Sequence, residues 1–255
     1  MVQKSKQVFR IFVQDIIYDL WLPNLFYRTI MATKTASRPF SRWTIDSVHA
    51  LGNLQAIESH PKLTEWLQST TTFSPEETSY LRHHQEILLK KIVTWNEEDL
   101  KMKFIAHVLA AADIDSNDIG YRTFFEATLK APVNGQNVVA KADMVVALGI
   151  AEPRQPFFFL QEYKRERGGD TDPLAQVLAA MLMAQTLNDY SHILYGCYII
   201  GRNWFFLVLE DNKYAVSNAY NSSADDLFQI VAILRALKPR VEAALQSPKS
   251  AKTAA

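Results

Sequence analysis

The segment at residues 157–164 constrains the fold more than any other part of the sequence. It opens on a nearly continuous apolar run, which is typical of a strand buried at the centre of a sheet. After a polar loop, Asp172 and Pro173 predict the start of a helix, because an acid is a good N-cap and proline suits the first helical position. The sequence therefore predicts a central strand that runs directly into a covering helix.

The rest of the chain predicts the order helix, β, β, β, helix, β, β, β, helix. Residues 46–110 are expected to be helical, with new helices capped by Ser74 and Asn96. A hairpin is expected to turn at Asn134-Gly135. The other expected elements are β-segments at 121–129, 138–148, 194–200, 203–209 and 213–217, and a last helix at 224–245. This order predicts an α/β fold with a central mixed sheet flanked by helices.

The two ends of the chain have patterns of their own. Apolar spacings of three and four over residues 1–31 predict an amphipathic helix, and residues 32–46 are expected to be a linker. The small, polar tail at 247–255 is expected to be disordered. We therefore predict a helical N-terminal extension over 1–90, a main domain over 91–246, and the tail.

Composition excludes several classes of protein. The 27 basic residues balance the 27 acidic ones, so a protein that coats nucleic acid through bulk positive charge is ruled out. The single cysteine, Cys197, can form neither an internal disulfide nor a multi-cysteine zinc site, and we expect it to be buried packing. Charges interrupt the apolar run near the N-terminus, so we expect a soluble, cytoplasmic protein with no membrane partner.

A small set of charged residues could carry chemistry. Glu162 and Lys164 lie two apart on the predicted central strand, so their side chains share one face at its C-terminal end. Asp143 interrupts an apolar strand, where an unpaired carboxylate is costly. Glu97 leads the apolar stripe of the helix before the sheet, although Glu98 fits almost as well. Carboxylates that gather beside a lysine predict a site for Mg²⁺ or Mn²⁺ that acts on phosphoryl groups.

Asp143, followed by Glu162-Tyr163-Lys164 on the next strand, resembles the Asp…Glu-x-Lys signature of the PD-(D/E)xK, restriction-endonuclease-like nucleases. The order of elements over about residues 90–240 is similar too, and within that superfamily the chain looks like a group of uncharacterised bacterial proteins. Ala142 stands where the family signature has proline. The resemblance implies a restriction-endonuclease-like core and metal-dependent cleavage of phosphodiester bonds, with DNA as the expected substrate.

The resemblance also implies a role for each residue. Asp143, Glu162 and the backbone carbonyl of Tyr163 would bind Mg²⁺ or Mn²⁺, and Glu97 would support the metal. Lys164 would position or activate the attacking water. Gln176, near the start of the helix after the strand, would contact the lysine, the substrate or the metal-bound water. Nucleases of this family often act as homodimers, and no pattern in the sequence identifies an interface.

A local basic patch would be needed for nucleic-acid binding by a neutral chain. Its expected members are Lys130, Lys141, Arg165, Arg167 and Arg202. The simpler alternative is a solvated rim balanced by neighbouring acids. Glu162 and Lys164 could likewise be an exposed charge pair of little energetic value.

Two further functions stay open at this point. The chain could be a non-catalytic module that binds nucleic acid or protein and keeps the nuclease-like fold. It could also hydrolyse a small phosphate ester or nucleotide.

Overall fold

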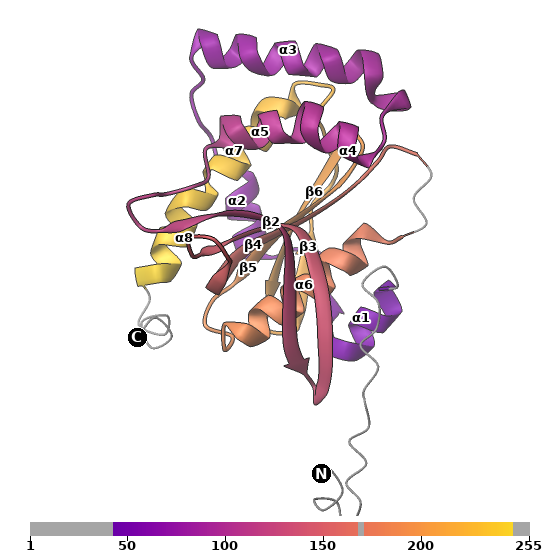
Figure 1. Cartoon of the computed structure of the whole chain (residues 1–255), viewed down its shortest axis with the longest axis vertical. Helices are drawn as coiled ribbons and strands as arrows, with labels where there is room; N and C mark the ends of the chain where they lie inside the picture. The colour runs from indigo at the N-terminus through magenta and orange to yellow at the C-terminus, as the bar shows by residue number, and fades with distance from the viewer. Residues whose placement is uncertain (1–42, 168–170, 247–255) are drawn as a thin grey trace, which may run out of the picture. The chain divides into compact units, whose positions relative to one another are not determined.

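The computed structural model describes residues 43–167 and 171–246, so the predictions for residues 1–42 and for the tail at 247–255 lie outside the described residues. The chain is an α/β protein with a mixed central sheet flanked by helices, as the sequence predicts (Figure 1). The sheet order is β1-β7-β6-β5-β4-β3-β2, and β8 pairs with β6. The domain boundary at residue 90 stays a prediction, although strand β1 lies before it and pairs with β7.

The strands confirm the predicted β-segments and add two short ones. Their bounds are β1 Gln55–Ala56, β2 Tyr121–Val133, β3 Gln136–Leu148, β4 Arg154–Lys164, β5 Leu194–Ile200, β6 Asn203–Glu210, β7 Lys213–Val216 and β8 Tyr220–Asn221. The pairs β4–β5 and β1–β7 are parallel and the others antiparallel. The apolar strand β4 lies between β3 and β5, which explains its nearly continuous burial.

The helices cover both faces of the sheet. Their bounds are α1 Ile45–Gly52, α2 Pro61–Leu67, α3 Pro75–Lys91, α4 Glu97–Leu100, α5 Ala106–Ala112, α6 Pro173–Leu187, α7 Asp226–Arg235 and α8 Leu237–Gln246. Helices α1 and α6 share one apolar core with the sheet, and the other helices share the second. The second core is centred on Trp66, whose ring packs edge-on against Phe159, Tyr195 and Phe206.

The predicted helix caps are confirmed. Ser74 accepts a hydrogen bond from the Glu77 backbone, Asp172 caps α6, and Asn96 caps α4. A π-helical segment, η3 (Lys101–Ile105), joins α4 to α5, and a 3₁₀ turn, η2 (Ile92–Thr94), follows α3. The π-helical turn was not predicted, because apolar periodicity does not distinguish it from an ordinary helical turn.

Two boundaries differ from the predictions. The segment at 224–245 is two helices rather than one, because Pro239 cannot donate a hydrogen bond to the Arg235 carbonyl and its ring clashes there. The predicted end of the linker at residue 46 is wrong, because Thr44 caps a helix that begins at Ile45.

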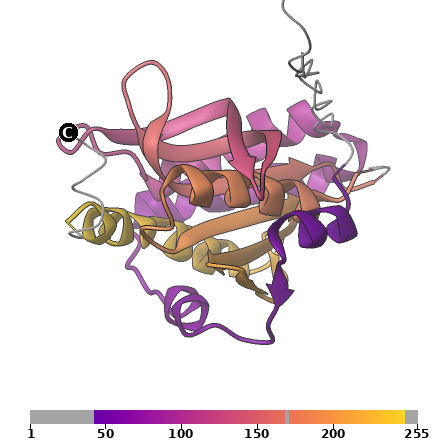
Figure 2. The same cartoon turned by 90° about the horizontal axis from the view of Figure 1, so that it is seen from below.

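The β2–β3 hairpin twists sharply near its middle. From Ala127 to Val133 every second residue of β2 is buried. The buried residue before Ala127 is Phe124, three positions earlier rather than two, so the alternation of buried and exposed residues changes phase between them. The break falls at Glu126, which has a left-handed backbone with φ 57°. Asp143 lies directly opposite, between the paired residues Met144 and Ala142. Beyond this point the hairpin curls over α6 (Figures 1 and 2).

The close packing of α6 on β5 gives a first prediction. A Cβ atom at Gly196 would lie 2.7 Å from Met181 Sδ and 3.1 Å from Leu207 Cδ2. We expect Gly196→Ala to lower the free energy of unfolding by about 1–3 kcal/mol, measured by urea denaturation. Adding Met181→Ala should make the double variant less destabilised than the sum of the two single changes. Wild-type stability of Gly196→Ala would contradict this packing.

Candidate active site

The site lies where β3 separates from β4. The last paired residues of the two strands are Met144 and Gln161, so Asp143 and Glu162 come directly after the end of the ladder. Asp143 Oδ2 accepts a hydrogen bond of 3.0 Å from the backbone N–H of Tyr163. The carboxylate thus takes the place of a lost strand partner, and this contact points it toward the residues that follow on β4.

Four predicted residues are brought together here. Lys164 Nζ lies 2.6 Å from Glu162 Oε1 and 3.5 Å from Glu97 Oε1, and the carboxyl groups of Glu162 and Asp143 are close enough to shift each other's pKa. Glu97 therefore reaches Lys164, whereas Glu98 pairs instead with Lys101 at 3.7 Å. The three acids and the lysine come from α4, β3 and β4, so the fold assembles them from distant parts of the chain.

The site is buried at its centre and open at its edge. Glu162 is 1% exposed and Asp143 is 8% exposed, whereas the side chain of Glu97 is 40% exposed. The alternative that Glu162 and Lys164 form an exposed charge pair is therefore wrong. Buried acids that are close together need compensation, and Lys164 supplies part of it.

Burial and mutual repulsion shift the titration of these groups. Burial, followed by the charge of Asp143, raises the pKa of Glu162 to about 8. Burial also raises the pKa of Asp143 against the opposing effects of the Tyr163 N–H and Lys164, and it raises the pKa of Glu97. Burial lowers the pKa of Lys164, but the surrounding acids, Glu162 first, outweigh it, so the net shift is upward. Lys164 is therefore an ammonium at neutral pH.

The donor set fits a hard divalent cation. The side chains that meet here offer carboxylate oxygens, which Mg²⁺ and Mn²⁺ accept, rather than histidine or cysteine. Within residues 43–167 and 171–246, no three acidic, histidine or cysteine side chains already surround a point that would hold a metal ion. The Lys164 ammonium lies between Glu162 and Glu97 instead, so a cation would have to take over the charge balance that the lysine now provides.

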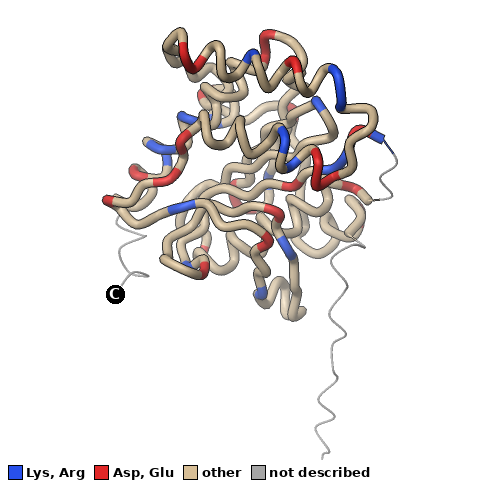
Figure 3. The backbone as a smooth tube through the Cα atoms, turned by 45° about the horizontal axis from the view of Figure 1, so that its top comes forward, with Lys and Arg blue, Asp and Glu red and all other residues tan. Residues whose placement is uncertain are grey.

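The remaining predicted residues are less closely involved. Gln176 is buried on α6, and its side-chain oxygen has no hydrogen-bond partner in the described part of the chain. Arg202 forms an ion pair with Glu166, with Nε and Oε1 3.0 Å apart, and Arg165 and Arg167 are exposed in the loop after β4. Lys130 and Lys141 lie on the hairpin, where Lys141 pairs with Glu126. Acidic and basic positions are interleaved along the backbone (Figure 3).

Sequence reasoning missed Glu126 and Lys101, which lie beside the site. Lys101 Nζ is 3.0 Å from Glu126 Oε1. Glu126 could have been noticed as a charge that breaks a β-pattern, and Lys101 as the residue one helical turn after Glu97. Cys197 is buried as expected. Elsewhere in the fold, the ring of His84 stacks on that of His107 with centroids 3.5 Å apart.

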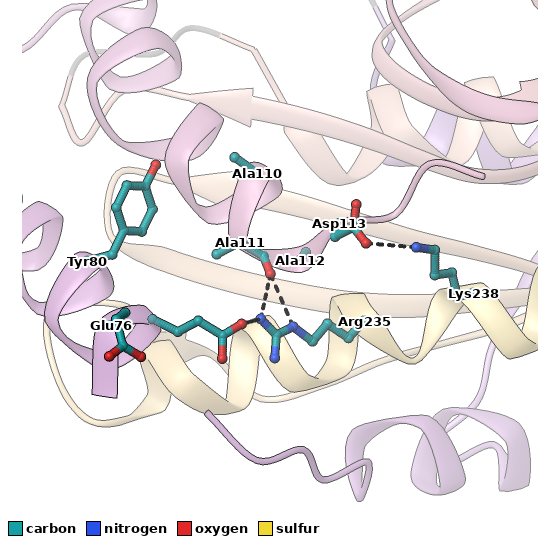
Figure 4. A pocket seen from close by; sticks show the side chains of 9 residues that line it. Glu76, Tyr80, Ala110, Ala111, Ala112, Asp113, Arg235 and Lys238 are labelled. Atoms are coloured by element: carbon teal, nitrogen blue, oxygen red, sulfur yellow. Dashed lines mark hydrogen bonds and ion pairs between the residues drawn. The ribbon is translucent and has the colours of Figure 1, made fainter. Parts of the chain in front are cut away.

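A separate pocket of about 720 Å³ lies among α3, α5, α7 and α8 (Figure 4). Arg235 there pairs with Glu77 and donates to the Ala111 carbonyl, and Lys238 pairs with Asp113. Each of its two basic side chains is thus paired with an acid, and its lining residues include none of the three acids or the lysine of the candidate site.

Comparison with known proteins gives no further guide to function. No family model and no curated protein matches the chain. None of the helices in residues 43–167 and 171–246 combines the length and the apolar character needed to cross a lipid bilayer.

The raised pKa of Glu162 gives a second prediction. Its proton is held more tightly in the folded state, so the stability it contributes is complete below the unfolded pKa of about 4.3 and is lost as pH rises toward about 8. In metal-free buffer containing a chelator, Glu162→Gln should lose less stability than wild type between pH 5 and 9. We expect its Tm at pH 9 to exceed that of wild type by about 5 °C, measured by calorimetry.

An exposed acid on α4, next to Glu97, provides a control for this change. Glu98 has a side chain that is 70% exposed, and Glu98→Gln should follow the wild-type pH profile. Identical pH profiles for wild type and Glu162→Gln would show that Glu162 is not held in its protonated form.

Proposed function

We propose that this protein is a metal-dependent phosphodiesterase, a DNA nuclease of the PD-(D/E)xK type with a restriction-endonuclease-like core. The observation that carries the proposal is the convergence of Asp143, Glu162 and Glu97 around Lys164 at the point where β3 leaves β4. Burying several carboxylates close together lowers the stability of the fold. A bound cation would offset this cost, so such a cluster favours a metal-binding function.

The residues divide the work according to their positions. Asp143 and Glu162 are the proposed metal ligands, with the Tyr163 carbonyl beside them, and Glu97 is the more exposed acid at the rim. The metal would supply positive charge next to the phosphoryl oxygens and lower the pKa of a bound water. Gln176 is the proposed polar contact from α6.

Lys164 acts as a hydrogen-bond donor in this scheme. Because the surrounding acids raise its pKa, it stays protonated at neutral pH and does not accept the proton of the attacking water. Its ammonium can instead orient that water or stabilise negative charge on a phosphoryl oxygen. Water attack at phosphorus then breaks one P–O bond and yields a phosphate monoester and a hydroxyl group.

Cleavage assays give the third prediction. Wild type with Mg²⁺ or Mn²⁺ should cut duplex DNA, and Asp143→Asn, Glu162→Gln and Lys164→Ala should each reduce the rate by about a hundredfold or more. Glu97→Gln should also be impaired, whereas Glu86→Gln, a change at an exposed acid of α3 that pairs with Lys90, should cut at the wild-type rate. Equal residual cleavage by wild type and the Asp143 and Lys164 variants would refute the assignment.

A second candidate is a non-catalytic binding module that keeps this arrangement. The observation in its favour is that the Lys164 ammonium already bridges Glu162 and Glu97, so the cluster has an internal counter-charge. In such a protein the lysine would be a structural cation.

Calorimetry with Mn²⁺ separates the two candidates and gives the fourth prediction. A metal site should show binding heat that depends on the ionisation enthalpy of the buffer, because Glu162 must release its proton to bind. Asp143→Asn should abolish that heat. The absence of both heat and a thermal shift for wild type would favour the binding module.

A further inference from the structure

A second charged cluster adjoins the candidate active site. Glu126 on β2 forms ion pairs with Lys101 from η3, at 3.0 Å, and with Lys141 from β3. Lys101 is largely buried, with a side chain 16% exposed, whereas those of Glu126 and Lys141 are about two-fifths exposed. One carboxylate thus lies between two lysines at the edge of the site.

Both lysines are tied closely to the proposed metal ligands. Lys141 precedes Asp143 by two residues on β3, and Lys101 follows Glu97 by one helical turn and begins the π-helical segment. Lys101 Nζ also lies 5.3 Å from the centre of the Tyr163 ring. A phosphodiester whose scissile group lies at Asp143 and Glu162 would therefore have its neighbouring phosphates near these two ammonium groups.

Glu126 is unfavourable in this place unless the two lysines hold it. Its backbone has φ 57°, a conformation that L-residues with side chains rarely adopt. It lies opposite Asp143 in the hairpin, and its negative charge contributes to raising the pKa of that acid. A carboxylate and a phosphodiester make similar contacts with lysine, so Glu126 has the charge and hydrogen-bonding capacity to stand in for a phosphate.

The cluster opens toward solvent. Glu126 lines a groove of about 610 Å³ between β2 and the loop that follows β3, together with Arg122 and Phe125. Phe125 is 53% exposed, and Arg122 adds a third cation. Neither lysine lines this groove, but the side chain of Lys141 is about two-fifths exposed, so an extended chain of phosphates could approach the cluster from solvent.

We propose that Lys101 and Lys141 form a phosphate-binding subsite for the nucleic-acid backbone, and that the Glu126 carboxylate occupies this subsite until a substrate phosphate displaces it. This inference rests on the proposed function, because it takes nucleic acid as the substrate. It assigns to Glu126 the role of an internal competitor that weakens binding to anions without touching the reacting bond.

Binding measured without metal tests the subsite separately from catalysis. A fluorescently labelled DNA duplex is titrated with protein in a chelator-containing buffer, at several salt concentrations, and followed by anisotropy. Glu126→Gln should bind about threefold or more tightly than wild type, and the magnitude of its slope of log K against log salt should increase by about 1, because the freed lysines now release counterions when they bind phosphate. Lys101→Ala and Lys141→Ala should bind more weakly, with shallower slopes.

Two controls make the result specific. Lys103→Ala removes a lysine from the same helical segment that pairs with Asp99 instead, and it should leave the affinity close to that of wild type. Glu126→Asn replaces the carboxylate with a shorter, uncharged side chain, and asparagine tolerates the left-handed backbone. This variant should reproduce the tighter binding if Glu126→Gln folds poorly. Thermal melts verify that each variant is folded.

Unchanged or weaker binding by both folded Glu126 variants would overturn the subsite, as would the absence of DNA binding by every protein in the series. The two proposals fail separately. If wild type cuts DNA but the Glu126 variants bind as wild type does, only the subsite is wrong. If the Glu126 variants bind more tightly but wild type cuts nothing with Mg²⁺ or Mn²⁺, the hydrolytic function is wrong and the subsite remains.

Discussion

The hydrogen bond from the Tyr163 N–H to Asp143 Oδ2 is the interaction on which the candidate site depends. Strands β3 and β4 stop pairing at Met144 and Gln161, which would leave a buried backbone donor on β4 without a partner. Asp143 supplies the acceptor from its side chain, so the strands can diverge without losing that bond. The same contact fixes one acid next to Glu162 and leaves room at the sheet edge for Glu97 and Lys164.

Charge balance explains how such a cluster can exist in a folded protein. Three carboxyl groups meet with one ammonium at the centre, and Glu126 adds a further acid held by two lysines. The raised pKa of Glu162 means that a proton supplies part of the missing positive charge at neutral pH. A proton, an ammonium and a divalent cation are alternative ways to neutralise the same acids, so metal binding at this site would be coupled to pH and to the position of Lys164.

The sequence predicted the sheet and its main elements well, because β4, the Asn134-Gly135 turn and the caps at Ser74 and Asp172 carry strong local signals. It also predicted that Glu162 and Lys164 lie side by side, since they are two residues apart on one strand and share a face. It could not predict that Glu126 reverses the alternation of β2 or that Lys101 starts a π-helical turn. Both depend on tertiary twist and helix packing, which leave no periodic signature. Pro239 indicates the break between α7 and α8, but apolar residues continue at helical spacing on both sides of it, and this pattern favoured a single helix.

The π-helical turn at Lys101–Ile105 has a consequence for how this region can vary. Such a turn accommodates one residue more than an α-helical turn, and one residue corresponds to about 100° of rotation around the axis. If the same residues formed an ordinary α-helix while Phe104 and Val108 stayed anchored in the core, the part of the helix before the turn would be rotated by about 100°. Glu97 would then be swung away from Lys164. The π-helical turn thus keeps the rim acid in phase with the sheet, and a relative that lacks one residue there would need only an ordinary α-helical turn to place the same acid beside the lysine.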